Sequence, residues 1–329
     1  MHLDILVLVT EVLFGQSDSS RFVLIEIIVR TTTQLEMLRL IEMSAPDTQD
    51  KQRTRRVVVP AIEALIDKKI PVGTDGFVRV VDYLGHDGSI TEAARVSYTG
   101  GKTLRDDQGL INYLLRHQHT SVFEFCEIVI HVRAMWHIAK QWMRHRTANV
   151  NEISGRYTAL PSEYYVPDAL YTRPKNSKQG RSDERADNES GLIQEMGEAM
   201  QRSRDVYDKM VEARVAYETA RVVLPIGTYT EWYWKIDVHN LLRFIRLRSH
   251  NSAQVEIQEY ARAIGGIVEQ WLPVTYAAFK KYQLDAVTLS SDALRCLKMH
   301  LEGKVVTQEM SGMSAGEWRE FQTEVLDRQ

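Results

Sequence analysis

The stretch "RHRTANVNEISGRY" at residues 144–157 places three arginines, a histidine and a glutamate among small polar residues, directly after an apolar segment. Gly155 and the small side chains around it leave the backbone free to approach a ligand. Ser154 and the nearby amides can donate to phosphate oxygens, and Arg156 can bind one through two parallel hydrogen bonds. Glu152 supplies an acceptor for ribose hydroxyls or ring N–H groups. This combination predicts a pocket for a nucleotide monophosphate.

Two further segments carry arginines beside apolar helices. One is "ETARVVLP" at 218–225, with Glu218 and Arg221, and the other is "LRFIRLRS" at 242–249, with Arg243, Arg246 and Arg248. For any one isolated segment, a surface salt bridge at a helix end is the favoured alternative, and it contributes about 0–1 kcal/mol. The small polar composition of 144–157 favours a pocket over that alternative.

The bulk composition excludes several classes of protein. The chain has 329 residues, of which 44% are hydrophobic and 26% charged, as in a soluble globular protein. A net charge of −3 gives no basic field for nucleic acid or an anionic membrane. No apolar run reaches the roughly 18 residues that span a bilayer, and the start of the chain lacks a basic region of the signal-peptide kind. We therefore expect a cytoplasmic protein without nucleic-acid or membrane partners.

The cysteines, histidines and glycine-rich stretches indicate neither a metal centre nor a dinucleotide fold. Cys126 and Cys296 are too few for a disulfide framework and lie in no reactive motif. His117 and His119 have no further ligands at metal spacing. "TGGKT" at 99–103 has Val96 where a phosphate loop requires glycine. "AIGGI" at 263–267 lies inside a helical pattern with no preceding strand.

Hydrophobic periodicity predicts an α+β fold in which helices dominate. Alternating apolar residues predict strands at 77–84 and 123–132. Helical spacing predicts helical structure over six segments, the first of them capped by Ser89: 89–97, 107–117, 134–146, helices over 191–224 before Pro225, 237–248, and 252–272 before Pro273.

The chain divides into three parts at this level of analysis. Residues 1–70 are an N-terminal extension, 71–282 are the main domain, and 283–329 are a polar, weakly patterned tail. Residues 168–190 have no periodicity and predict a flexible surface insert. Two interpretations of 1–42 stay open, since these residues are either a genuine β-rich extension or an over-long reading of a gene that starts at Met43.

The spacing Arg144-His145-Arg146, seven residues, then Ser154 resembles the signature of the flavin-dependent thymidylate synthase family. The resemblance runs from about 70 to 282. It includes "ARVSY" at 94–98, "LLRHQHTSVFEF" at 114–125, "YETARVVLP" at 217–225, "WKIDVHNLLRFIRLR" at 234–248 and "AQVEIQEYA" at 253–261.

The resemblance implies a helix-rich, non-Rossmann α+β fold with an antiparallel or mixed sheet. It also implies the reductive methylation of dUMP to dTMP. The carbon would come from methylenetetrahydrofolate, and the hydride from NADPH by way of FAD. Members of the family are homotetramers whose active sites are built from several subunits, and they use no cysteine nucleophile. No metal is implied.

The resemblance further assigns roles to residues. Arg248 matches the arginine that contacts the uracil edge and favours its ionised form, and His119 matches a histidine at the reacting face of the flavin. Ser154 has no base partner that would make it a nucleophile. The positions that match dUMP contacts are Gln141, Trp142, Met143, Arg144, Glu152, Ile153, Ser154, Gly155, Arg156, Arg221 and Arg248. The positions that match FAD contacts are Ser121, Arg144, His145, Arg146, Glu152, Asp237, His239 and Arg243.

The sequence departs from the family pattern at a few positions. Asp237 and Arg243 stand where other members have asparagine or histidine, which bears on the adenine and ribose contacts of FAD. Asn149, Ser252 and Val122 replace a common serine, histidine and proline. These positions are peripheral to the expected dUMP pocket.

Two rival interpretations use the same arginines. An RNA-binding or nucleotide-sensing module would add exposed aromatic residues and a basic field, whereas Trp136 and Trp142 are expected inside an amphipathic helix. An inactive relative would keep the fold without the site. Against that rival, the chain retains Arg144, Ser154, Arg156, Arg221 and Arg248.

Overall fold

The computed structural model describes residues 56–97, 107–175 and 180–327. The two interpretations of 1–42 and the "TGGKT" segment therefore lie outside the described residues. Within the described part, no helix has the length and apolar character that crossing a membrane requires. The same residues contain no group of three or more His, Cys, Asp or Glu side chains arranged to hold a metal ion.

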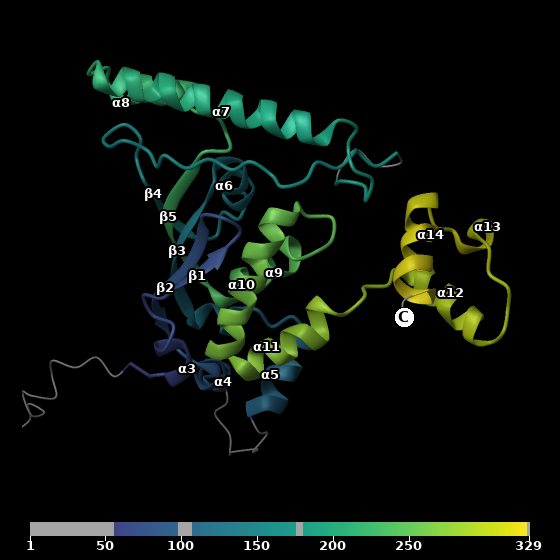
Figure 1. The fold of residues 1–329 in the computed structure, drawn as a ribbon. Coiled ribbons are helices and arrows are strands. Elements are labelled where there is room, and N and C mark those ends of the chain that lie inside the picture. The colour runs from purple at the N-terminus through teal and green to yellow at the C-terminus, as the bar shows by residue number, and fades with distance from the viewer. Residues whose placement is uncertain (1–55, 98–106, 176–179, 328–329) are drawn as a thin grey trace, which may run out of the picture. The chain divides into compact units, whose positions relative to one another are not determined.

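The centre of the fold is a five-stranded antiparallel sheet with the order β1-β2-β3-β5-β4 (Figure 1). Its strands are β1 Lys69–Val72, β2 Gly76–Leu84, β3 Glu127–Met135, β4 Asn149–Glu152 and β5 Tyr229–Asp237. The longest ladder pairs β3 with β5, from Glu127 opposite Asp237 to Met135 opposite Tyr229. The sheet confirms the predicted α+β class.

The strand predictions were partly right. The predicted strand at 77–84 is confirmed as β2. The strand predicted at 123–132 begins only at Glu127, because Ser121–Phe125 form the 3₁₀ helix η1. There Phe123 is buried while Phe125 is 64% exposed, so their alternation in sequence does not reflect a strand. Strand β5 was not predicted, although buried Trp232, Trp234 and Ile236 alternate along it.

Helices surround this sheet, and the ends of several differ from those predicted from the sequence. They are α3 Pro60–Glu63, α4 Asp87–Arg95, α5 Asp107–Arg116, α6 Trp136–Trp142, α7 Glu189–Glu212, α8 Tyr217–Ala220, the 3₁₀ helix η2 Arg221–Val223, α9 Val238–Arg248, α10 Val255–Trp271, α11 Pro273–Phe279 and the π-helix η3 Lys280–Leu284. Helix α10 packs on β1 and β2, and α9 contacts β5 (Figure 1).

Two helix predictions need correction. Helix α4 is capped by His86, whose ring accepts from Gly88 N, and Ser89 takes the third helical position of a capping box. The helices predicted over 191–224 are confirmed as α7, α8 and η2, with a break after Glu212 where Arg214 adopts a positive φ. The helix predicted at 134–146 ends at Trp142, where the next turn tightens and His145 N donates to Trp142 O.

A cluster of aromatic side chains joins α6, β5 and α9. The Trp142 ring lies 5.3 Å from Trp232, 5.2 Å from Trp234 and 4.5 Å from Phe244, measured between centroids. All four are buried, and each such aromatic pair contributes about 0.5–1.5 kcal/mol beyond area burial. The cluster therefore fixes the end of α6 against α9, which carries the third arginine segment.

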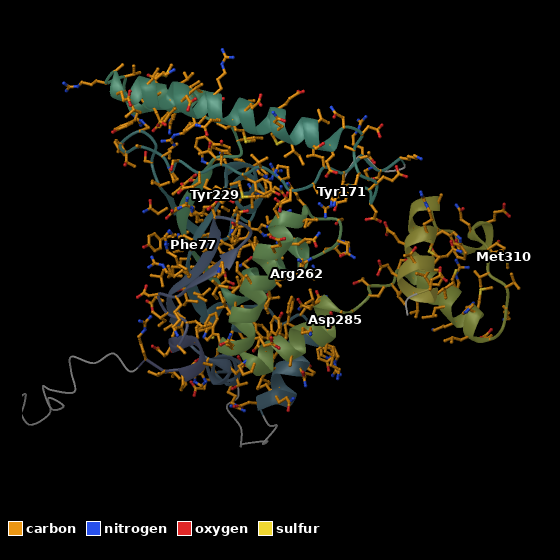
Figure 2. All side chains as sticks on the ribbon, viewed as in Figure 1. Phe77, Tyr171, Tyr229, Arg262, Asp285 and Met310 are labelled. Atoms are coloured by element: carbon orange, nitrogen blue, oxygen red, sulfur yellow. The ribbon has the colours of Figure 1, made fainter. Side chains whose placement is uncertain are left out.

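The segment predicted as a flexible insert has its own hydrogen bonds. In its described residues, Tyr171 bridges to Arg185, and Ala186 N donates to Leu170 O over 2.9 Å. Arg181 and Arg185 lie over the ring of Tyr171, at 4.1 and 4.9 Å from its centroid. Tyr171 itself is labelled in Figure 2. These contacts close the base of the segment, and its flexibility stays a prediction.

The tail is more structured than the sequence predicted. It contains α12 Ser291–Leu301, α13 Gln308–Ser311, α14 Ala315–Phe321 and the π-helix η4 Gln322–Leu326. Ser290 and Ser314 cap two of these helices by accepting backbone N–H groups. The tail has its own hydrophobic cluster of Ala293, Cys296, Met313 and Phe321. Serine caps followed by apolar spacing were the signal that sequence analysis missed.

Candidate active site

The decisive stretch at 144–157 forms a turn followed by an edge strand. After α6 ends, the chain passes through Arg144, His145 and Arg146 and then pairs as β4 along β5, with Glu152 opposite Trp232. The stretch therefore carries its charged residues to two places, one beside the end of α6 and one beyond the end of β4.

The first place is the Arg248 cluster, which comprises Gln141, Arg144, His145, Arg243 and Arg248. Arg248 is the last residue of α9 and is half-buried. Its Nε donates to His145 Nε2 over 3.0 Å, and its Nη2 donates to the Gln141 carbonyl oxygen over 3.0 Å. Residues 103 and 107 positions apart in the chain are thereby brought together.

The imidazole in this cluster is neutral near pH 7. Burial, followed by the charges of Arg248 and Arg243, lowers the pKa of His145 to about 4. Because an arginine Nε–H can only donate, His145 Nε2 is the acceptor and Nδ1 carries the hydrogen. The ring thus directs the Arg248 guanidinium without adding a charge of its own.

The cluster holds an excess of fixed positive charge. Burial, and then the nearby charge of Arg144, lower the pKa of Arg248 below its ordinary value. The guanidinium groups stay charged at any physiological pH, so their mutual repulsion favours an anion between them. Two cations that act on a neutral imidazole, with Arg144 acting on one of them, are a donor set that suits an anionic ring or a phosphate.

The predicted flavin residues occupy neighbouring elements. Ser121 lies on η1, which packs against α9, and α9 carries His239 and Arg243. Asp237 caps α9, since its carboxylate accepts from Asn240 N over 3.0 Å and from Asn240 Nδ2 over 2.8 Å. Aspartate and asparagine are both strong N-cap residues, which gives the departure from the family pattern at this position a structural reason.

His119 follows α5 and is exposed. Its ring lies edge-on to Tyr113 at 5.7 Å and is tilted against His117 at 6.3 Å, measured between centroids. It precedes η1, the element that carries Ser121. Its role at a flavin stays a prediction.

The second place is the Arg156 cluster, which comprises Glu152, Ser154, Gly155, Arg156 and Glu218. Arg156 Nε donates to Glu218 Oε2 over 3.1 Å, with the two side chains 55% and 54% exposed. An exposed pair of this kind contributes about 0–1 kcal/mol, so a phosphate can replace Glu218 at little cost. Arg221 begins η2 directly after α8, the helix that carries Glu218.

Two residues of the Arg156 cluster have structural roles that the sequence did not reveal. Glu152 Oε1 accepts from Thr230 Oγ1 over 2.7 Å and from Trp136 Nε1 over 3.2 Å. Gly155 is buried, and a Cβ there would meet Leu160 Cδ1 at 2.9 Å. A side chain at this position would therefore require Leu160 to move, which is a packing constraint that the sequence did not reveal, and the approach of a ligand at Gly155 stays a prediction.

The structure places some predicted contact residues in the core. Trp142 is fully buried, so its side chain lines no pocket and only its backbone can face one. Met143 packs on the main hydrophobic cluster, and Ile153 packs on a second one formed by Leu160, Tyr207, Ala220 and Leu224. Among the described residues, no hydrogen bond or ion pair joins the Arg248 cluster to the Arg156 cluster within one chain.

Residue Gln254 has a place in the site that sequence analysis did not assign. Its Oε1 accepts from Gln141 Nε2 over 2.6 Å. The residue lies within "AQVEIQEYA", a segment that carried the resemblance but to which no role was given. Only the folded chain shows that it meets Gln141, 113 positions away.

The comparisons with known proteins decide the family. Residues 79–274 match the protein family described as "Thymidylate synthase complementing protein". A "Flavin-dependent thymidylate synthase" from Ruegeria pomeroyi is 46% identical over 277 residues, which cover 82% of this chain and 92% of the relative. The chain belongs to the flavin-dependent thymidylate synthase family.

Other relatives match this chain over a similar length. A "Flavin-dependent thymidylate synthase" from Rickettsia prowazekii is 43% identical over 285 residues, covering 82% of this chain and 97% of the relative. A crystal structure of a UMP/dUMP methylase from Streptomyces cacaoi bound with 5-Br dUMP has a TM-score of 0.58 and 31% identity, and covers 65% of this chain and 98% of that one. The resemblance stated from the sequence is confirmed, and the tail lies beyond the family match.

Proposed function

We propose that this member of the family converts dUMP into dTMP. We further propose that the carbon comes from methylenetetrahydrofolate, that NADPH is the reductant, and that the resident flavin is FAD. The observation that carries the proposal is the Arg248 cluster, in which Arg248 donates to a neutral imidazole and lies within the electrostatic reach of Arg144, while Arg243 acts on the same imidazole. The names of the curated relatives support a flavin, and the solved methylase supports a uracil nucleotide as substrate.

The chain's residues would act mainly by binding and orienting. Arg248 would contact the uracil edge and stabilise its ionised, more nucleophilic form, as a permanently charged and planar donor can. His145 and the Gln141 carbonyl would hold that guanidinium in place. Reduced FAD, when bound, supplies the hydride.

The chemistry requires no thiolate from this chain. Burial, and then the charge of Asp87, raise the pKa of Cys126 to about 12. A buried thiol with that pKa is not ionised at neutral pH and is a poor nucleophile. Cys296 belongs to the tail cluster and is buried as well. This supports a route without a covalent enzyme–nucleotide bond through cysteine.

The phosphate of dUMP would be bound by Ser154, Arg156 and Arg221. Because no hydrogen bond or ion pair within the described part of one chain joins the Arg156 cluster to the Arg248 cluster, we propose that a complete site takes the two clusters from different subunits of a homotetramer. Exposed apolar side chains near the Arg156 cluster, namely Tyr157, Val222 and Ile226, suit such an interface. A cytoplasmic location stays a prediction from the composition.

The RNA-binding rival has little support. Trp142 is in the core, and Trp136 is partly buried against the second hydrophobic cluster, so neither indole is an exposed stacking platform in the manner of RNA recognition. The net charge of −3 also lacks the basic field that such binding uses.

The direct test is spectroscopic and chemical. The purified protein is expected to be yellow, to change its flavin absorbance when dUMP is added, and to form dTMP from dUMP with methylenetetrahydrofolate and NADPH. A colourless protein that FAD does not reconstitute, and that forms no dTMP, would overturn the proposal.

A further inference from the structure

We propose that Gln254 is a positioning residue that fixes the carboxamide of Gln141 and thereby sets the preference for uracil over cytosine. This inference rests on the proposed function, because it takes the bound ring to be that of dUMP. It concerns a residue that makes no expected contact with the nucleotide itself.

Gln141 is held from two sides. Its side-chain Nε2 donates to Gln254 Oε1 over 2.6 Å, and its backbone carbonyl accepts from Arg248 Nη2 over 3.0 Å. Since Arg248 is proposed to face the uracil edge and is bonded to the backbone of Gln141, we place the Gln141 carboxamide beside the same edge. Helices α9 and α10 thus each hold one polar group of the same glutamine on α6.

Gln254 uses its acceptor across this junction and not within its own helix. It is the N-cap residue of α10, yet its side chain makes no capping hydrogen bond there. An N-cap side chain ordinarily accepts an N–H of the first helical turn. Here the side-chain oxygen is directed to Gln141 on another helix.

The backbone on either side of Gln254 is fixed. Ala253 N donates to His250 O over 2.9 Å, and Ala253 O accepts from Gln258 Nε2 over 2.8 Å. Gln258 N also donates to Gln254 O over 3.1 Å. Gln254 therefore offers its oxygen from a well-supported position, as a residue that orients a neighbour requires.

The consequence for recognition follows from counting donors and acceptors. A glutamine side chain has two N–H donors and one oxygen. With one N–H committed to Gln254, Gln141 presents its oxygen and the other N–H. Ionised uracil, the form that Arg248 is proposed to favour, offers only acceptors along this edge, at N3 and the carbonyl oxygens, whereas cytosine offers an N3 acceptor beside an amino donor. A pinned amide that turns its remaining N–H to this edge matches uracil, while a free amide can also turn its oxygen to the amino group of cytosine.

The experiment compares Gln254→Leu, which removes the acceptor, with Gln254→Glu, which keeps an acceptor in a similar shape. Gln270→Leu is the matched control, because Gln270 is an exposed glutamine of the same helix whose side chain donates to the helix's own backbone, at Gly266 O. Calorimetry on the flavin-loaded enzyme gives the dissociation constants for dUMP and dCMP. Flavin content, the KM for NADPH and thermal unfolding are measured beside them.

For Gln254→Leu we expect dUMP binding to weaken about tenfold, and the preference for dUMP over dCMP to fall by a similar factor. The flavin content and the KM for NADPH should not change. Gln254→Glu should stay within about threefold of the wild type, because it still accepts from Gln141. Gln270→Leu should match the wild type in every measurement.

Two results would overturn the positioning role. One is wild-type dUMP affinity and preference in Gln254→Leu. The other is a loss in Gln254→Glu as large as that in Gln254→Leu, with both proteins folded and flavin-loaded. Gln141→Leu distinguishes a failure of the positioning role of Gln254 from a failure of the proposed function. If it weakens dUMP binding while Gln254→Leu does not, only the positioning fails, whereas a wild-type protein that neither binds dUMP nor forms dTMP refutes the proposed function.

Discussion

The Arg248 cluster and the Arg156 cluster derive from one stretch of sequence, yet they differ in how their charges are held. Arg248 is half-buried and donates to two neutral acceptors, a histidine ring and a backbone carbonyl. Arg156 is more than half exposed and pairs with a carboxylate. The first arrangement is set before a ligand arrives and keeps its positive charge uncompensated. In the second arrangement, the phosphate of a bound nucleotide would replace the Glu218 carboxylate as the partner of Arg156.

This difference indicates whether each cluster contributes to the rate of the reaction or to the affinity for the nucleotide. A preorganised, partly desolvated cation stabilises charge that develops during a reaction. A solvated arginine at a surface mainly adds affinity for a phosphate that is present before and after the chemistry. We therefore expect the Arg248 cluster to govern kcat and the Arg156 cluster to govern the requirement for dUMP.

The largest effect is expected for Arg248→Lys. A compact ammonium cannot donate to His145 and to Gln141 while also contacting the uracil edge. We expect kcat to fall by about 100-fold or more, as when an oriented electrostatic group is lost, in steady-state assays of dTMP formation. Arg246→Lys, an exposed neighbour on the same helix, is the control and should keep its rate. A near-normal kcat in Arg248→Lys would refute the role of Arg248.

The next effect is expected for Arg156→Ala. The loss of a charge-assisted contact of about 1.5–3 kcal/mol corresponds to an increase of roughly 10- to 150-fold in the KM for dUMP. The KM for NADPH should change far less, because Arg156 is assigned to the phosphate of dUMP alone. Equal effects on both substrates would argue against a phosphate contact.

A third prediction sharpens the contrast by testing why Gly155 is a glycine. Gly155→Ala is expected to reduce the free energy of unfolding by about 1–3 kcal/mol, because its Cβ would press on Leu160. In a double-mutant cycle measured by urea unfolding, Leu160→Ala should remove part of that penalty. Additive costs in the double variant would favour the ligand-approach explanation instead.

The smallest expected effect is on the pH dependence of the free energy of unfolding. The folded chain keeps His145 neutral down to pH about 4, while the unfolded chain protonates it near 6.5. The unfolded state thus binds more protons between these values, so the free energy of unfolding falls as the pH falls through this window. His145→Gln should flatten that dependence in urea unfolding curves. An unchanged slope would show that His145 is not the group responsible.

The sequence predicted the fold best in segments where the apolar residues follow a single repeat, either that of a strand or that of a helix. Strand β2 and helices α5 and α9 have clear apolar repeats, and the structure confirms them. Strand β5 was missed although Trp232 and Trp234 alternate along it, because its repeat lies next to a long helical pattern. The end of α6 was missed because burial of Trp142 against Phe244, and not a local signal, decides where the turn begins.

The residues of the site could be predicted from the sequence, but the contacts between them could not. The arginines of the Arg248 cluster were all assigned from the sequence, and the structure brings His145 and Arg248 into contact. No spacing rule reveals the tautomer of His145, the pair of Gln141 and Gln254, or the packing demand at Gly155. Each depends on side chains far apart in the chain, which only tertiary structure brings together.

The central claim is that the two clusters meet around one nucleotide across a subunit boundary. Mixing subunits tests it most directly: Arg248→Lys and Arg156→Ala chains are co-expressed, and the dTMP-forming activity of the purified hybrid oligomers is compared with that of each parent. The account predicts hybrids more active than either parent, because some sites then combine an intact Arg156 from one subunit with an intact Arg248 from another. Hybrid activity that never exceeds the mean of the parents would contradict it.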